Sequence, residues 1–297
     1  YARWEGGKFE CVRYWTHGYS PSLEESEWKE AFVDVFSQAV ERQMVSDVPL
    51  GGFLSGGIDS SLVVWMMSRA ASTPVQTFSL GFGDAKSDET RYAEEVARRF
   101  STDHTSNLVS HDAMELLPSL VKQLDEPFAD SSIIPLYLVS LETQKSVKVA
   151  LSGDGGDELF AGYTNYIGER VLGWLNVLPS PVMRALAGGA RLGSRSGNRL
   201  LGRLDNVLST RDLKLYQRYL EKAAICKTGV KSGLYTPEFQ AATENGNWKE
   251  RVEALLDEQA SSDPVEELGC LDFQYYLPND MLTKVDRMSM LCSLEVR

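Results

Sequence analysis

A run of small and polar residues after Leu54 has a composition suited to binding phosphate. The run consists of Ser55, Gly56, Gly57, Ile58, Asp59, Ser60 and Ser61. Because the two glycines lack a Cβ atom, successive backbone N–H groups can converge on one anion, and the three serine hydroxyls add donors. The apolar spacing of residues 60–71 predicts a helix whose positive N-terminal end faces the same anion. The run therefore predicts a pyrophosphate-binding turn and nucleotide chemistry.

Asp59 distinguishes this turn from other phosphate loops. The chain contains neither the lysine-bearing pattern Gly-x4-Gly-Lys-Ser/Thr nor the dinucleotide pattern Gly-x-Gly-x-x-Gly. A carboxylate beside a phosphate repels it unless a divalent cation lies between them, so we interpret Asp59 as a Mg²⁺ ligand. The alternative is an ordinary glycine-rich turn in which the aspartate caps the helix.

A second turn of the same kind follows the apolar segment 147–151. It contains three glycines among three carboxylates, in the order Ser152, Gly153, Asp154, Gly155, Gly156, Asp157 and Glu158. Three carboxylates within five residues are costly to bring together in a buried turn unless a cation or a proton-transfer task compensates them. The pattern therefore indicates a site, whereas the alternative is a solvated acidic turn that caps a helix.

Four blocks of sequence, taken together, resemble the synthetase domain of glutamine-dependent asparagine synthetases, in the PP-loop ATP pyrophosphatase superfamily. The blocks are residues 53–61, 125–132, 151–163, and 277–290 with 293–297. They span most of the chain and occur in the order typical of that family. The resemblance implies that the chain binds ATP and Mg²⁺.

The nucleotide contacts are expected at the ends of two strands. Adenine needs an apolar slot and backbone hydrogen bonds, and Leu54 and Leu80 are placed for both. Leu80 stands where relatives contact adenine, while the alternative for an isolated strand leucine is core packing. Ser152 and Gly153 match the second nucleotide contact of the family, and a position at a strand end suits hydrogen bonding to ribose or phosphate.

Asp59 and Asp157 are the expected pair of magnesium ligands. Each ends a separate glycine turn, and Mg²⁺ commonly takes one or two protein carboxylates together with phosphates and waters. The resemblance assigns Asp154 to the position where several relatives have a glutamate in a proposed general-base role, although aspartate reaches less far.

Lys284 and Arg287 are the candidate catalytic cations. They are three residues apart on an expected helix, so both side chains can be presented to a phosphate or a carboxylate. The alternative is a surface face on which these cations pair with Asp280 or Asp286.

The resemblance implies amidation of aspartate to asparagine. The side-chain carboxylate attacks the α-phosphorus of ATP to give β-aspartyl-AMP and pyrophosphate, and ammonia then displaces AMP. Residues 129–135 contain no arginine matching the one that holds aspartate in relatives, so another carboxylate acceptor stays open. The residues are also compatible with a β-lactam-forming relative, a PP-loop enzyme that adenylates a tRNA base, or a non-catalytic nucleotide-binding module.

Composition narrows the class of partner. The chain has 297 residues, a formal net charge of −12 and 43% hydrophobic residues, which favours a globular enzyme acting on small molecules over a nucleic-acid-binding surface. Four scattered cysteines and three histidines form no zinc pattern, and no apolar stretch approaches the ~20 residues of a membrane helix. We expect a cytoplasmic protein that contacts neither nucleic acid nor membrane, with a homodimer as one expected assembly.

Alternating strand and helix signals predict an α/β fold with a parallel sheet flanked by helices. Strands are expected at 47–54, 75–82, 105–109 and 147–151, and helices at 23–44, 60–71, 87–100, 111–124 and 134–145. The resemblance implies the sheet architecture of adenine nucleotide alpha hydrolases. Ligands of such sheets gather at the carboxyl ends of the strands, where both glycine turns lie. A mainly helical part is expected next, with residues 188–203 as a mobile loop or a connection between lobes.

The expected domain division has three parts. Residues 1–20 are a linker from a glutaminase domain, residues 21–165 form the ATP-binding core, and residues 166–297 form a helical part truncated at its C-terminus. The chain begins at Tyr1 and stops directly after an apolar block, so we expect a longer native polypeptide. The resemblance implies that the glutaminase domain supplies ammonia from glutamine, and that a catalytic lysine follows Arg297, which would leave this piece incomplete.

Overall fold

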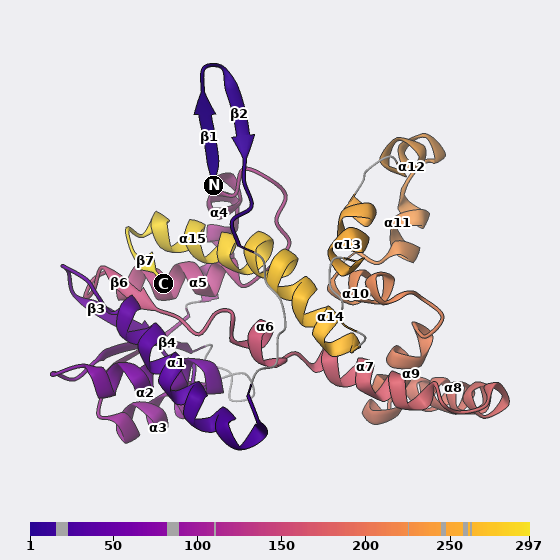
Figure 1. The fold of residues 1–297 in the computed structure, drawn as a ribbon, viewed down its shortest axis with the longest axis horizontal. Helices are drawn as coiled ribbons and strands as arrows, with labels where there is room; N and C mark the ends of the chain where they lie inside the picture. The colour runs from indigo at the N-terminus through magenta and orange to yellow at the C-terminus, as the bar shows by residue number, and fades with distance from the viewer. Residues whose placement is uncertain are drawn as a thin grey trace. The chain divides into compact units, whose positions relative to one another are not determined.

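The computed structural model describes residues 1–15, 23–81, 89–109, 111–224, 226–244, 248–257, 261 and 263–297. It confirms the predicted α/β fold, in which a parallel sheet flanked by helices is followed by a mainly helical part (Figure 1). Two compact units are present. The helical unit comprises Tyr1–Pro21 and Ala161–Tyr275, and the sheet unit comprises Ser22–Phe160 and Tyr276–Arg297. Residue 82 of an expected strand and residues 87–88 of an expected helix lie outside the described residues.

Within the described residues, five parallel strands form the sheet in the order β5-β4-β3-β6-β7. These are β3 (Leu50–Phe53), β4 (Gln76–Gly81), β5 (Asp103–Leu108), β6 (Val149–Leu151) and β7 (Glu295–Val296). The last strand was not expected, because two residues are too few to show an alternating pattern. It pairs with β6, so the end of the chain belongs to the sheet unit.

The order of the strands creates a switch point between β3 and β6. From β3 the chain moves outward to β4 and β5, and it then returns to β6 on the opposite side of β3. In such sheets the connections leave in opposite directions at this point, which opens a crevice at the carboxyl ends of the two strands. Gly52 of β3 is in register with Leu151 of β6, so both glycine turns begin at this crevice.

Helices cover both faces of the sheet. On one face Val40 of α1 and Met67 of α2 pack with Leu151, and α3 closes over α2; on the other, Val139 of α5 packs with Phe78. The bounds are η1 (Glu25–Glu27), α1 (Trp28–Gln43), α2 (Ile58–Ala70), α3 (Thr90–Phe100), η2 (His111–Leu116), α4 (Leu117–Gln123), α5 (Ile133–Thr143), α6 (Gly156–Phe160) and α15 (Leu282–Leu291). The predicted elements therefore recur with shifts of a few residues at their ends.

The helical unit contains mostly short helices. They are α7 (Thr164–Leu175), α8 (Ser180–Arg195), α9 (Arg199–Ser209), α10 (Leu215–Ala223), α11 (Thr228–Leu234), α12 (Pro237–Glu244), α13 (Trp248–Asp257) and α14 (Pro264–Leu271), and the π-helix η3 (Asp272–Met281) leads out of the unit. Among the described residues, no helix has the length and apolar character needed to cross a bilayer. The first residues, expected as a linker, form a hairpin of β1 (Ala2–Glu5) and β2 (Lys8–Cys11) around two positive-φ glycines.

The expectation of a mobile loop at residues 188–203 is wrong. Most of these residues lie in α8 and α9, which pack against each other as an antiparallel pair. Apolar spacing outweighs the glycines inside α8, because Met183 and Ala190 of α8 form a buried cluster with Leu208 of α9. Asn198 caps α9 by accepting hydrogen bonds from two backbone N–H groups of its first turn.

A buried ion cluster holds two helices of this unit together. Glu169 of α7 is 2% exposed and accepts hydrogen bonds from Arg218 and Lys222 of α10. Burial acts to raise the pKa of Glu169, but the two cationic donors outweigh it and hold the pKa below its ordinary value.

Glu169→Gln should lower the free energy of unfolding by about 3 kcal/mol at pH 7, because two partly buried cations lose their carboxylate. The stabilisation from a lowered pKa is complete above the ordinary glutamate pKa and is lost as the pH falls through the folded-state value. Urea unfolding curves of wild type and variant should therefore converge in acid. Glu250→Gln, at an exposed position of α13, is the matched control and should change little. A difference that does not depend on pH would contradict the ionic role.

Candidate active site

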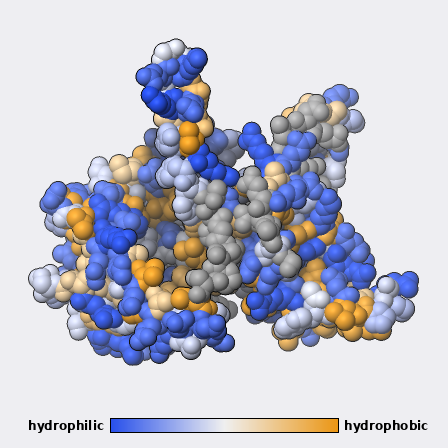
Figure 2. Space-filling model, in the orientation of Figure 1, coloured by the Kyte–Doolittle hydropathy of each residue, from blue (hydrophilic) through white to orange (hydrophobic). Residues whose placement is uncertain are grey.

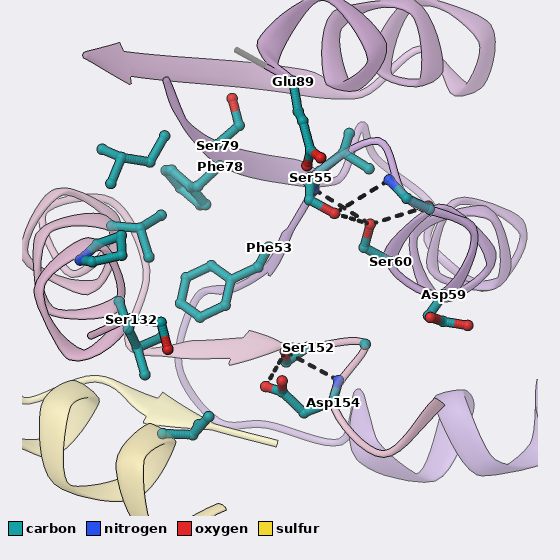
Figure 3. A pocket seen from close by; sticks show the side chains of 18 of the residues that line it. Phe53, Ser55, Asp59, Ser60, Phe78, Ser79, Glu89, Ser132, Ser152 and Asp154 are labelled. Carbon is teal, nitrogen blue, oxygen red and sulfur yellow. Dashed lines mark hydrogen bonds between the residues drawn. The ribbon is translucent and has the colours of Figure 1, made fainter. Parts of the chain in front are cut away.

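Hydrogen bonds among its own serines fix the first glycine turn (Figure 3). The hydroxyls of Ser55 and Ser60 lie 3.0 Å apart, and Ser60 Oγ also accepts from the Ser55 backbone N–H at 3.3 Å. The Ser61 hydroxyl donates to the Gly57 carbonyl at 2.6 Å. These contacts hold the end of β3 against the start of α2, which sets the direction of the helix relative to the strand.

Gly56 is required by its backbone and by its surroundings. Its φ is +82°, and a Cβ built there would lie 2.5 Å from Tyr92 Cβ and 2.6 Å from the Ala93 backbone nitrogen of α3. Gly57 occupies the N-cap of α2 without a side-chain capping hydrogen bond. The first N–H groups of α2 are therefore available to an anion at the positive end of the helix.

The second glycine turn touches the first. A Cβ built on Gly153 would lie 2.8 Å from the Ser60 backbone nitrogen, and one built on Gly156 would lie 2.6 Å from Asp59 Cγ. Larger residues at these two positions would push the turns apart. Both glycines therefore allow the loop after β6 to lie directly against the first turn of α2.

This approach brings carboxylates together. Burial raises the pKa of Asp157, and the nearby charge of Asp59 raises it further. Asp154 is exposed and accepts a hydrogen bond from the Ser152 hydroxyl at 2.6 Å. Within the described residues, no group of three or more histidine, cysteine, aspartate or glutamate side chains could hold a metal ion by itself.

A cavity of about 580 Å³ lies between the two turns and the start of α5. The predicted residues that line it are Leu54, Ser55, Gly57, Asp59, Ser60, Leu80, Ser152, Gly153, Asp154, Asp157 and Lys284. The predicted residues Gly56, Ser61 and Arg287 are not part of its lining. The structure thus gathers most of the predicted site into one space, from segments more than 200 residues apart.

Several lining residues were not named as site residues from the sequence. They are Phe53, Phe78, Ser79, Glu89, Thr90, Ser132, Pro135, Leu136, Val139 and Val285 (Figure 3). Glu89 and Thr90 begin α3 after a strand, and a start of that kind places a residue at the carboxyl edge of a parallel sheet. That signal could have identified them. The sequence predicts that Phe53 and Phe78 belong to the hydrophobic core, because an aromatic residue in a buried strand has no feature that distinguishes a cavity-lining position from a core position.

Lys284 enters the cavity wall as one half of a buried ion pair. Its side chain is 6% exposed and donates to Asp130, which is 22% exposed. Asp130 also accepts from the Ser132 backbone N–H at 2.8 Å. Burial acts to raise the pKa of Asp130, but the Lys284 and Ser132 hydrogen bonds outweigh it and lower the pKa. The partner is therefore neither of the two aspartates considered from the sequence.

Arg287 lies on the same helix but serves another contact. Its guanidinium donates to the backbone carbonyls of Gln123 and Leu124 and contacts the Asp125 carboxylate. These bonds attach α15 to the end of α4. Arg287 therefore holds the loop that leads to Asp130.

Comparisons with known proteins agree on one family. The sequence model of asparagine synthase matches residues 31–297. The chain is 33% identical over 289 residues to asparagine synthetase (glutamine-hydrolyzing) 1 of Bacillus subtilis, covering 96% of this chain and 44% of the relative. It is 29% identical over 173 residues to asparagine synthetase 3 of the same organism, covering 51% and 27%, and 31% identical over 144 residues to the Zea mays asparagine synthetase, covering 44% and 24%. The chain spans less than half the length of these relatives.

Proposed function

The chain belongs to the asparagine synthase family, and from this premise we propose that it is the part of a C–N ligase that activates a carboxylate with ATP. The observation that carries the proposal is the contact between the two glycine turns at the switch point of the sheet. There the N-terminal N–H groups of α2 meet a loop in which Gly153 and Gly156 allow close approach, beside a cavity of about 580 Å³. A nucleotide triphosphate needs both the donors and the room.

Leu54 and Leu80 are proposed to contact adenine, and Ser152 and Gly153 to contact ribose or phosphate. Leu54 is 1% exposed and lies at the end of β3, while Ser152 follows β6 across the switch point. The Gly56 and Gly57 turn would receive the pyrophosphate.

Asp59 and Asp157 fit a magnesium ion. Burial raises the pKa of Asp157 and the charge of Asp59 raises it further, and a divalent cation would relieve the repulsion between the two carboxylates. Bound Mg²⁺ would neutralise charge on the phosphate oxygens. Two carboxylates suit this ion, because it usually keeps waters and phosphate oxygens as its other ligands.

The proposed reaction has two steps. An oxygen of the aspartate side-chain carboxylate attacks the α-phosphorus of ATP. The bond between the α-phosphorus and the oxygen that bridges to the β-phosphorus breaks, so that β-aspartyl-AMP forms and pyrophosphate is released. Ammonia then attacks the acyl carbon, AMP leaves, and Asp154 accepts the proton released from nitrogen. Asp154 suits that role because it is exposed at the turn and oriented by Ser152. Lys284 is proposed to position, through Asp130, the part of the cavity wall that α5 forms. Arg287 is proposed to position the loop that precedes Asp130.

The rest of the protein is proposed from the length of the relatives. In this view residues 1–20 connect to a glutaminase domain that supplies ammonia, 21–165 form the ATP-binding core, and 166–297 form the helical part. A homodimer is the proposed assembly.

A second acceptor is favoured by one observation. Lys284 is the single cation among the described residues that line the cavity, and it is already paired with Asp130. An acceptor with fewer negative charges than aspartate would therefore fit the cavity as well.

The test is pyrophosphate release by the full-length protein with ATP, Mg²⁺ and ammonia, measured against a panel of carboxylates. We expect release that depends on aspartate, with AMP and asparagine formed in equal amounts. If release depends on another carboxylate instead, that carboxylate is the acceptor and aspartate is not. If no carboxylate supports pyrophosphate release while nucleotide binding is intact, the chain is a non-catalytic nucleotide-binding module.

A further inference from the structure

An arginine-rich stretch without acidic residues stands out in this acidic chain. Residues 170–204 contain six arginines and no aspartate, glutamate or lysine, although 42 acidic residues in 297 would place about five in a stretch of this length. The formal net charge of the whole chain is −12. The stretch is therefore a local positive region that the function proposed above does not use.

Five of the six arginines lie on one helical hairpin, formed by α8 and α9, and the sixth, Arg170, lies on α7. Arg184, Arg191 and Arg195 are 7 and 11 residues apart on α8, so they project within about 40° of one another around the helix. Arg199 and Arg203 are four residues apart on α9 and share a face. All five are exposed, and none forms an ion pair with a described residue.

Exposed aliphatic side chains accompany the arginines. Leu192 is 69% exposed and Leu200 is 75% exposed, near the end where the two helices join, and Val182 is 48% exposed. Figure 2 shows hydrophobic side chains at the surface of this hairpin, at the lower right of the view. These leucines are additional to the apolar residues that hold the hairpin together, because Met183 and Leu208 are only 2% and 3% exposed.

We propose that the α8–α9 hairpin binds the surface of a membrane that contains anionic phospholipids. The guanidinium groups would contact lipid phosphates, and the leucines near the helix junction would enter the boundary between headgroups and acyl chains. A helix that lies on a membrane need not be long or uniformly apolar, so the absence of spanning helices among the described residues is compatible with this contact.

The composition of the hairpin favours lipid over RNA. Single-stranded RNA is commonly held by bases stacked on aromatic rings, and residues 180–209 contain no aromatic residue. Exposed leucines contribute to lipid binding, whereas they contribute little to phosphate contacts in a nucleic acid. Aliphatic and arginine side chains together are typical of interfacial helices.

The positive surface continues into a cavity within the same unit. This cavity has a volume of about 800 Å³. Its lining includes Arg203 of α9, Lys222 of α10 and Lys227, together with one carboxylate, Glu221. Lys222 also contacts buried Glu169, which fixes its position. Arg203 and Lys227 therefore remain as the cationic groups that the lining offers to a phosphate headgroup beside the hairpin.

The test is co-sedimentation of the full-length protein with phosphatidylcholine vesicles and with vesicles of phosphatidylcholine and phosphatidylglycerol at 7:3. We expect at least tenfold stronger binding to the anionic vesicles, weakened by added salt. Arg191→Gln with Arg195→Gln should weaken that binding by about 25-fold, at about fivefold for each arginine. Leu192→Ser with Leu200→Ser should weaken it at least tenfold at unchanged charge.

Arg98→Gln with Arg99→Gln removes the same charge from exposed positions of α3 and is the matched control. Each variant is checked for an unchanged circular dichroism spectrum and unfolding midpoint. Equal binding to both kinds of vesicle, or equal losses from the hairpin and control pairs, would overturn the proposal. Hairpin-dependent binding of RNA in a gel shift without hairpin-dependent vesicle binding would overturn it as well and would reassign the surface to nucleic acid.

Discussion

Asp59→Asn should lower the rate of ATP-dependent pyrophosphate release by the full-length protein at least tenfold. Asp59 lies in the first turn of α2, against Gly156 of the second turn, where the proposed magnesium ion would meet the phosphates. Asparagine keeps the shape but removes the charge that binds the ion. The measurement is the steady-state rate of pyrophosphate release at saturating ATP and Mg²⁺.

The same substitution should not lower the melting temperature of the nucleotide-free protein. Burial raises the pKa of Asp157 and the charge of Asp59 raises it further, so at neutral pH the ionised pair costs stability. Removing the Asp59 charge relieves part of that cost. The pKa of Asp157, followed by NMR titration, should accordingly fall toward its ordinary value in the variant.

Asp103→Asn is the matched control, because Asp103 is exposed at the start of β5, whereas the site lies at the carboxyl ends of the strands. It should leave the rate within twofold of wild type. If Asp59→Asn also retains full turnover, the metal assignment is wrong. A loss of turnover accompanied by a lower melting temperature would point to damage of the fold instead.

The two turns could be predicted because their chemistry is local. Glycines, serines and aspartates within a few residues of a strand end specify a turn and its donors, and the structure has a strand before each turn and a helix after it. The sequence predicted that both turns lie at the carboxyl edge of one sheet, but it did not predict the direct contact of Gly153 and Gly156 with α2. That contact depends on β6 lying beside β3, and nothing in the sequence of either strand specifies which strand lies next to it.

Lys284 illustrates a second limit. From the sequence its partner was sought nearby in the chain, at Asp280 or Asp286. The partner is Asp130, 154 residues earlier, because α15 packs on α5. Charge patterns along one helix therefore identify local pairs only, and a buried cation takes the partner that tertiary packing supplies.

The hairpin illustrates a third limit, in which one signal conceals another. Glycine, serine and arginine in residues 188–203 suggested a loop, yet Met183 and Ala190 keep the spacing of an apolar helix face in α8 and pack with Leu208 of α9. Glycines inside a helix weaken it by about 1 kcal/mol each, which packing against a second helix offsets.

Lys284→Met should lower the free energy of unfolding by about 3 kcal/mol at pH 7, because it leaves Asp130 partly buried without its cation. A second carboxylate increases the effect. Burial raises the pKa of Asp280 and the charge of Asp130 raises it further, and Asp280 Oδ1 is buried without a hydrogen-bond partner among the described residues. Removing the lysine would leave these two carboxylates facing each other. The measurement is urea unfolding followed by circular dichroism.

The pH dependence and a double variant separate this ionic role from simple loss of packing. In wild type the lowered pKa of Asp130 adds stability above the ordinary aspartate value, and this is lost as the pH falls through the folded-state pKa. In Lys284→Met the pKa of Asp130 should instead be raised, so the variant should lose stability as the pH rises through it. Adding Asp130→Asn should then recover most of the loss, as a double-mutant cycle would measure. If the double variant is as unstable as Lys284→Met alone, the lysine stem rather than its charge holds α15 against α5.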